Sequence, residues 1–174
     1  MSQTATQGAP QIKSRIGIHS GEVSAGNVGA LDRSNYTVLG DNVNLAARLE
    51  GANKEYDTSV MISEATWALV KGKFVVRELD RIRVVGKKNA VRIYELIAPL
   101  GSPLPVSQPF LDAYGEALAA FRDRRWEEAI HGFQKAMELK ADDLPSKHYI
   151  ERSKVFQLMP PPADWEGVFD LTSK

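Results

Sequence analysis

The sequence has no cysteine, no net charge and no long apolar run. The absence of cysteine excludes disulfides, thiolate nucleophiles and cysteine-based zinc sites, and it suits a reducing cytoplasm, where we expect this chain. The 22 basic and 22 acidic residues balance, which gives no support for bulk electrostatic binding to nucleic acid. No apolar stretch approaches the roughly 18 to 20 residues that cross a bilayer, so we expect no membrane segment.

What the sequence does contain is typical of globular proteins of one or two small domains. Of the 174 residues, 43% are hydrophobic and 25% are charged. The opening MSQTATQGAP has neither a basic start nor an apolar stretch, so it is not a secretory signal, and we expect residues 1–13 to be a disordered lead.

Residues 14–98 alternate short β-branched segments with helical patterns, which predicts an α+β fold. A helix is expected from about Asp41 to Lys54. FVVREL and RIRVV each look like a strand, and residues 81–98 are expected to form a hairpin around GKKNA.

A proline-rich stretch at residues 99–109 predicts a linker to a second, all-α module. Apolar and small residues recur at helical spacing in WEEAIHGFQKAMELK, which resembles the second helix of a tetratricopeptide repeat. A further helix is expected from Ser146 to Gln157, before three prolines. One helical hairpin is too little for a solenoid, so we expect its apolar face to pack on the first module, another subunit, a protein partner or a missing part of the parent protein.

The segment YTVLGDNVNLAARLEGA places a strand, a glycine turn and a helix in order. Asp41 or Asn42 can cap that helix. Asn44 and Arg48 lie four residues apart on one face, near the helix start, where an anion is favoured. A stripe of Leu45, Leu49 and Ala52 is expected to face the core. The alternative to ligand binding is a structural role for each residue. Asn44 would then satisfy backbone groups at the helix start, and Arg48 would pair with a carboxylate on an ordinary solvated face.

The string from GIHSGEVSAGNVG through GDNVNLAARLE resembles the C-terminal half of the catalytic domain of class III nucleotidyl cyclases, the adenylate and guanylate cyclases. The resemblance runs from about Arg15 to Ala98 and implies half of a ferredoxin-like α+β sandwich. The C-terminal helices and the PPPADWEGV tail look more loosely like the extension of bacterial membrane-tethered receptor cyclases, which implies a parent protein anchored in the inner membrane. The implied organisation is a lead (1–13), a partial catalytic domain (14–98), a linker (99–109), a helical module (110–159) and a tail (160–174).

Site residues follow from this resemblance. Asn44 matches the asparagine that holds the ribose, and Arg48 matches the arginine that stabilises charge on the phosphate. Thr37 falls at the position that contacts the base and favours ATP over GTP. The lysine that contacts the terminal phosphates in the family falls at Val85 in this chain. Lys87, two residues further on, is the candidate for that role, with Lys88 as the alternative, and the choice stays open.

The resemblance omits the half of the domain that carries two metal-binding aspartates, so we assign no metal ligand to this chain. Mg²⁺ or Mn²⁺ is expected for the intact enzyme only. We therefore expect a fragment of an adenylate cyclase, which makes cyclic AMP and pyrophosphate, that is inactive alone and that works as a homodimer or with a complementary half. The alternative is a non-catalytic regulatory or dimerisation module. His19 is expected to be structural.

Overall fold

The computed structural model describes residues 13–30, 33–84 and 90–171. Its elements are β1 (Ile16–Ile18), β2 (Ser24–Ala30), β3 (Arg33–Leu39), α1 (Asp41–Tyr56), β4 (Val60–Ser63), α2 (Glu64–Val70), β5 (Phe74–Val84), β6 (Val91–Pro99), α3 (Gln108–Arg122), α4 (Trp126–Leu139), α5 (Leu144–Leu158) and β7 (Val168–Leu171). This mixture confirms the α+β class. None of the helices in these ranges has the length and apolar character needed to cross a membrane.

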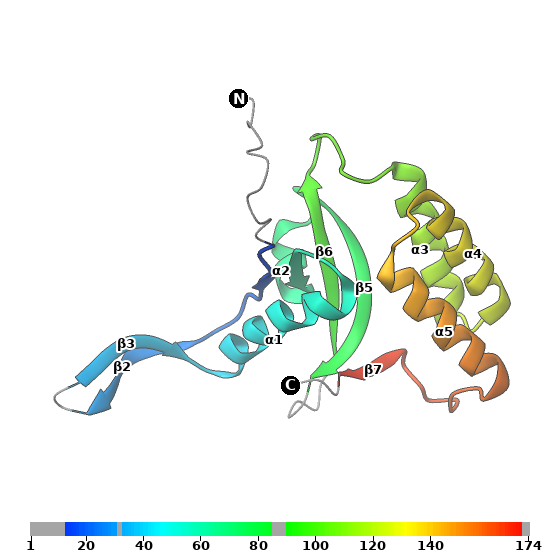
Figure 1. Cartoon of the computed structure of the whole chain (residues 1–174). Helices are drawn as coiled ribbons and strands as arrows, with labels where there is room; N and C mark the ends of the chain where they lie inside the picture. The colour runs from blue at the N-terminus through cyan, green and yellow to red at the C-terminus, as the bar shows by residue number, and fades with distance from the viewer. Residues whose placement is uncertain (1–12, 31–32, 85–89, 172–174) are drawn as a thin grey trace.

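Five strands form one sheet in the order β1-β4-β6-β5-β7, and β2 and β3 form a separate antiparallel ribbon. In Figure 1 the β2–β3 ribbon projects away from the sheet on one side, and α3 to α5 stand beside β5 and β7 on the other. The edge strand β1 pairs with β4 alone, in parallel. The sheet therefore ends in three residues whose outer edge has no neighbouring strand among the described elements.

Helix α1 is held by its buried face. Leu45, Leu49 and Ala52 are each at most 5% exposed, which confirms the predicted stripe. The helix runs two residues beyond the expected end and stops at Asp57, which adopts the left-handed conformation with φ 47°.

Strand β1 lies directly against α1. A Cβ added to Gly17 would lie 2.2 Å from the Glu50 backbone nitrogen and 2.4 Å from the Ala46 carbonyl oxygen, so only glycine allows this approach. The fully buried Asn53 joins the same elements, because its side-chain amide donates to the Ile16 carbonyl at 3.1 Å and accepts from the Thr58 hydroxyl at 2.8 Å. Helix and strand are thus fixed by both packing and hydrogen bonds.

The two strands expected at FVVREL and RIRVV are a single strand, β5, so that prediction was wrong. Register shifts occur between Val75 and Val76 and between Glu78 and Asp80, where β5 pairs with β6. These irregularities interrupt the alternation of inward and outward side chains, which explains why the sequence looked like two segments. The turn of the expected hairpin lies outside the described residues.

Helices α3 to α5 form a second core that rests on the sheet. Phe110, Tyr114, Phe121, Phe133 and Tyr149 are its large buried side chains. Helices α3 and α4 approach closely at Gly132: a Cβ added there would lie 2.7 Å from the Cβ of Ala117. The sequence left open whether the apolar face of these helices packs on the first module or elsewhere. In the structure it packs on the first module.

The tail also joins the sheet, which the sequence did not predict. Strand β7 pairs in parallel with β5, from Arg81 opposite Val168 to Val84 opposite Leu171. Arg81 and Arg83 of β5 form ion pairs with Glu166 and Asp170 at 3.1 and 3.0 Å. The sheet thus contains strands from both ends of the chain.

Two buried carboxylates connect the sheet to the helices. Asp80 of β5, 2% exposed, accepts hydrogen bonds from the Tyr56 hydroxyl of α1 at 2.8 Å and from Arg152 of α5 at 2.6 Å. Asp143, which caps α5 through the Ser146 amide, pairs with Arg77 of β5 at 2.7 Å. Burial opposes ionisation of Asp143, but Arg77 and donors from Lys140 and Ser146 outweigh it and lower its pKa.

Replacing Gly17 with alanine should destabilise the protein, because the new methyl group collides with the α1 backbone. We expect a loss of about 2 to 3 kcal/mol of unfolding free energy. Gly51→Ala is the matched control, since its Cβ meets nothing within 4 Å and alanine favours a helix by about 0.5 to 1 kcal/mol. Urea unfolding followed by circular dichroism measures both, and equal stabilities would contradict the close contact.

Replacing Asp80 with asparagine should cost about 3 to 5 kcal/mol, because Arg152 keeps a buried charge without its partner. Asp142→Asn, whose side chain is 99% exposed, should change stability by no more than about 0.5 kcal/mol. Thermal unfolding of the two variants makes the comparison. If D80N unfolds at the same temperature as D142N, Asp80 does not join sheet and helices as described.

Candidate functional site

Strand β3 passes into α1 through a one-residue turn at Gly40. Gly40 has φ 141°, in the region that favours glycine, and its carbonyl accepts from the amides of Val43 and Asn44 at 3.2 and 3.3 Å. Gly40 is itself the N-cap and gives no side-chain cap. The expectation that Asp41 or Asn42 is the capping residue is therefore wrong, and the Asn42 side chain instead donates to the Glu22 carbonyl at 2.8 Å and contacts His19.

Asn44 and Arg48 are both exposed, and they lie one turn apart on α1. The buried Leu45 and Leu49 follow each of them by one position, so the polar pair borders the stripe that faces the core. Asn44 lies in the first turn, where backbone amides and the helix dipole favour an anion. A fixed amide and a forked guanidinium on one face can bind a hydroxyl-bearing phosphate ester.

Thr37 lies on β3, exposed and opposite Gly26 of β2. It comes three residues before the Gly40 turn, so it belongs to the ribbon, and Asn44 and Arg48 belong to the helix. Two cavities in the described part of the chain are lined by none of these three residues. Lys87 and Val85, assigned to the terminal phosphates, lie outside the described residues.

Within residues 13–30, 33–84 and 90–171, no group of three or more His, Asp or Glu side chains is arranged to hold a metal ion. The described residues therefore do not fit a metal centre of their own.

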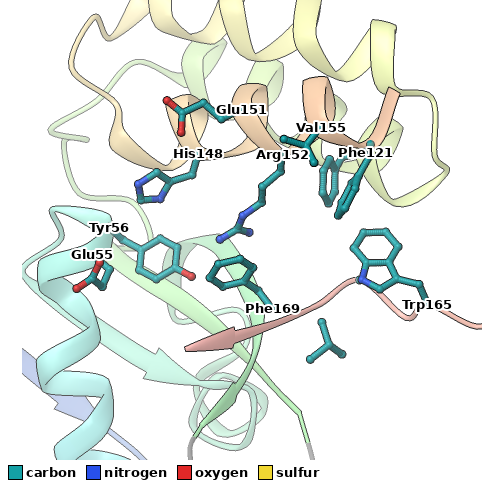
Figure 2. Close-up of a pocket in the computed structure, with 12 residues that line it drawn as sticks. Glu55, Tyr56, Phe121, His148, Glu151, Arg152, Val155, Trp165 and Phe169 are labelled. Carbon is teal, nitrogen blue, oxygen red and sulfur yellow. The ribbon is translucent and has the colours of Figure 1, made fainter. Parts of the chain in front are cut away.

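The larger cavity lies at the opposite end of α1, where α1, α5 and the segment leading into β7 meet. Its volume is about 450 Å³, and Figure 2 shows Tyr56, Arg152 and Phe169 converging at its centre. The Arg152 guanidinium lies 3.8 Å from the centre of the Phe169 ring. Arg152 also binds Asp80 of β5, as does Tyr56. The residues around this cavity therefore form a junction between the helices and the sheet.

Electrostatics at this junction keep its groups in defined states. Burial, and after it the charge of Asp80, raises the pKa of Tyr56 and of Tyr149, so both stay protonated as donors. Burial, and after it Arg152, lowers the pKa of His148, which favours the neutral ring. The Tyr149 hydroxyl lies 2.9 Å from the Leu79 carbonyl and 3.1 Å from Asp80.

Sequence reasoning missed this junction. Its one signal was the helical spacing of His148, Tyr149 and Arg152, which predicts a shared face of α5. The partner of that face is 72 residues away, at Asp80, and no local pattern indicates it. The same holds for His19, whose ring contacts residues of α1 and β4.

Comparisons with known proteins agree with the sequence resemblance. The family model described as the adenylate and guanylate cyclase catalytic domain matches residues 1–98. Adenylate cyclase 1 of Rhizobium meliloti is 44% identical over 90 residues, covering 52% of this chain and 14% of that protein. The terminal-differentiation-specific adenylate cyclase of Dictyostelium discoideum is 33% identical over 145 residues, covering 81% of this chain and 7% of that protein. That second alignment extends past residue 98.

Among solved structures, the adenylyl cyclase CyaB from P. aeruginosa aligns with a TM-score of 0.45 and 36% identity, covering 52% of this chain and 46% of that one. The chain spans about a tenth of the length of the two curated relatives above. The family model nevertheless covers more than half of this chain, and it includes the turn and helix that carry Asn44 and Arg48. The chain therefore belongs to the family of adenylate and guanylate cyclase catalytic domains.

Proposed function

We propose that this chain supplies the base-recognition and transition-state side of an adenylate cyclase, which converts ATP to cyclic AMP and pyrophosphate. The observation that carries the proposal is the exposed pair of Asn44 and Arg48, one turn apart on a helix whose other face is buried. Membership of the cyclase family supports it. Thr37, with a hydroxyl that can donate or accept, makes ATP the preferred substrate.

The reaction explains why these residue types are needed. The ribose 3′-hydroxyl oxygen attacks the α-phosphorus and its proton passes to water, while the bond from the α-phosphorus to the pyrophosphate oxygen breaks and pyrophosphate leaves. Negative charge grows on the phosphoryl oxygens, where the Arg48 guanidinium stabilises it more strongly than in the ground state. The Asn44 amide orients the ribose for attack, and Lys87 or Lys88 contacts the terminal phosphates.

A complementary cyclase half, or a second chain that carries one, completes the site. It contributes the ligands for Mg²⁺ or Mn²⁺, since the described residues offer no such group. Exposed apolar side chains mark surfaces that such a partner would cover: Ile16 and Ile18 on β1 and Val28, Tyr36 and Val38 on the ribbon are 38% to 76% exposed. By itself the chain is inactive in this proposal.

We propose that the chain divides into a catalytic part and a helical extension. Residues 14–98 are the C-terminal half of a ferredoxin-like cyclase domain, and residues 110–159 are a tetratricopeptide-like extension. The close approach of α3 and α4, where Gly132 faces Ala117, supports a packed helical hairpin in this extension. Its packing on β5 makes it a support for the catalytic half.

The test mixes this chain with a cyclase protomer that keeps its two metal-binding aspartates but has its own asparagine and arginine replaced. Cyclic AMP formation from ATP and Mn²⁺ is measured. We expect activity in the mixture, a loss of about 100-fold or more in Arg48→Ala, and a loss of about 10-fold or more in Asn44→Ala. Lys54→Ala, exposed on the same helix, should stay within about twofold, as expected for a surface residue outside the site.

Thermal unfolding of the three variants separates a lost contact with nucleotide from a lost fold. All three residues are exposed, so their midpoints should agree closely with the wild type. No activity in any mixture, or full activity in R48A, would show that the pair does not act on ATP. The chain would then be an interaction module derived from a cyclase.

A further inference from the structure

His19 bridges three elements that surround the start of α1. It follows β1 directly, and its ring Nδ1 lies 2.7 Å from the Ser63 hydroxyl, at the end of β4. Its Nε2 lies 3.1 Å from the Asn42 side-chain oxygen, in the first turn of α1. Both ring nitrogens are therefore occupied by side chains from other elements.

The hydrogen bonds around this ring define its tautomer. The Glu22 carbonyl can only accept, so the Asn42 amide nitrogen must face it, at 2.8 Å, and the Asn42 oxygen must face His19. That oxygen also only accepts, so His19 Nε2 carries the hydrogen. In a neutral ring whose hydrogen is on Nε2, Nδ1 can only accept, so the Ser63 hydroxyl donates to it at 2.7 Å, and Ser63 Oγ in turn accepts from the Thr66 amide at 3.3 Å. The neutral ring protonated at Nε2 satisfies every partner.

This arrangement holds a turn that has no cap from its own N-cap residue. Gly40 provides no side-chain bond, so the side chain of Asn42 joins the first turn to the loop that follows β1. The fit is tight, because a Cβ on Gly21 would lie 2.5 Å from the Asn42 amide nitrogen. Asn44 is two residues further along the same turn and exposed, so the position of its amide follows that of the turn.

We propose that His19 is a positioning residue for the cyclase reaction: through Asn42 it orients the first turn of α1 and so aims Asn44 at the ribose. The proposal rests on the proposed function, because it gives Asn44 its task. His19 itself touches no substrate in this account. Its loss should lower kcat for a correctly folded chain, since misaligned ribose still binds but attacks more slowly.

Two substitutions separate the two contacts of the ring. His19→Gln places an amide nitrogen where Nε2 lies and keeps a donor for Asn42. His19→Asn places its amide oxygen near Nδ1, where it can accept from the Ser63 hydroxyl, and keeps the Ser63 contact alone. Each is assayed in the full chain with the complementary protomer described above. We expect H19N to lose about tenfold or more in kcat with KM for ATP within about twofold, and H19Q to stay within about threefold of wild type.

A purely structural histidine predicts a different pattern. Loss of either contact would then lower stability, and activity would follow the folded fraction in both variants. Thermal unfolding is measured alongside, and kcat is compared per folded protein. Rescue by Gln and not by Asn supports the positioning role. Equal activity of H19N and wild type, with Asn44→Ala impaired, overturns it and leaves the proposed function standing.

A measurement independent of activity covers the case in which H19N fails to fold. Nitrogen-15 correlation spectra of the wild-type chain at pH 8 report which ring nitrogen of His19 carries the hydrogen. We expect Nε2, and we expect Asn42→Asp, which cannot donate to Glu22, to lose kcat as H19N does. A ring protonated at Nδ1, or wild-type kcat in N42D, overturns the proposal. Full activity of Asn44→Ala would instead show that the proposed function has failed.

Discussion

The carboxylate of Asp80 is the interaction on which the rest of the structure depends. It is 2% exposed and bound by Tyr56 of α1 and Arg152 of α5, so one buried charge joins the sheet to helices on two sides. Burial opposes the charge of Arg152, but Asp80 outweighs it and raises the pKa of the guanidinium. A buried carboxylate without such partners would be strongly unfavourable, which makes this arrangement selective for a single packing.

This constraint bears on function because α1 is held at both ends. At its C-terminal end, Tyr56 binds Asp80 and Asn53 binds β1. At its N-terminal end, Asn42 binds the loop after β1. Between these anchors Leu49 is fully buried, so the helix cannot turn about its axis without breaking its core. The exposed face that carries Asn44 and Arg48 is thereby fixed relative to the sheet.

The helical extension takes part in the same framework. Arg77 of β5 pairs with Glu95 of β6 and with Asp143 at the start of α5, and both Arg77 and Asp143 are nearly inaccessible to solvent. Strand β7 then closes the other edge of β5. The C-terminal helices and tail thus pack on β5 through a buried ion pair and an added strand, so the second module and the sheet share one framework.

Sequence patterns predicted the local features well. The periodicity of Leu45, Leu49 and Ala52 predicted the buried face of α1, and with it the outward position of Asn44 and Arg48. Spacing alone indicated only that these two residues share a face near the helix start, where an anion is favoured. Their assignment to ribose and phosphate came from the family resemblance. The proposed contacts of Thr37 with the base and of Lys87 with the terminal phosphates stay predictions.

Features that depend on distant partners were missed. Asp80 fell between the two strands expected at FVVREL and RIRVV, and nothing near it in the sequence indicates that Arg152 and Tyr149 approach from the last helix. Strand β7 was missed for the same reason. Its four residues form a strand by pairing with the edge of β5, which is distant in the sequence. Asn42 was expected to cap α1, as asparagine at a helix start often does, but the Glu22 carbonyl and His19 are nearby and bind it instead.

The most direct measurement is a structure of this chain bound to a complementary cyclase half and an ATP analogue that cannot cyclise. The account predicts that the Asn44 amide lies within hydrogen-bond distance of the ribose and that the Arg48 guanidinium contacts the α-phosphate. A nucleotide bound away from α1, or an α1 whose Asn44 and Arg48 face the partner protein instead of the nucleotide, would contradict it.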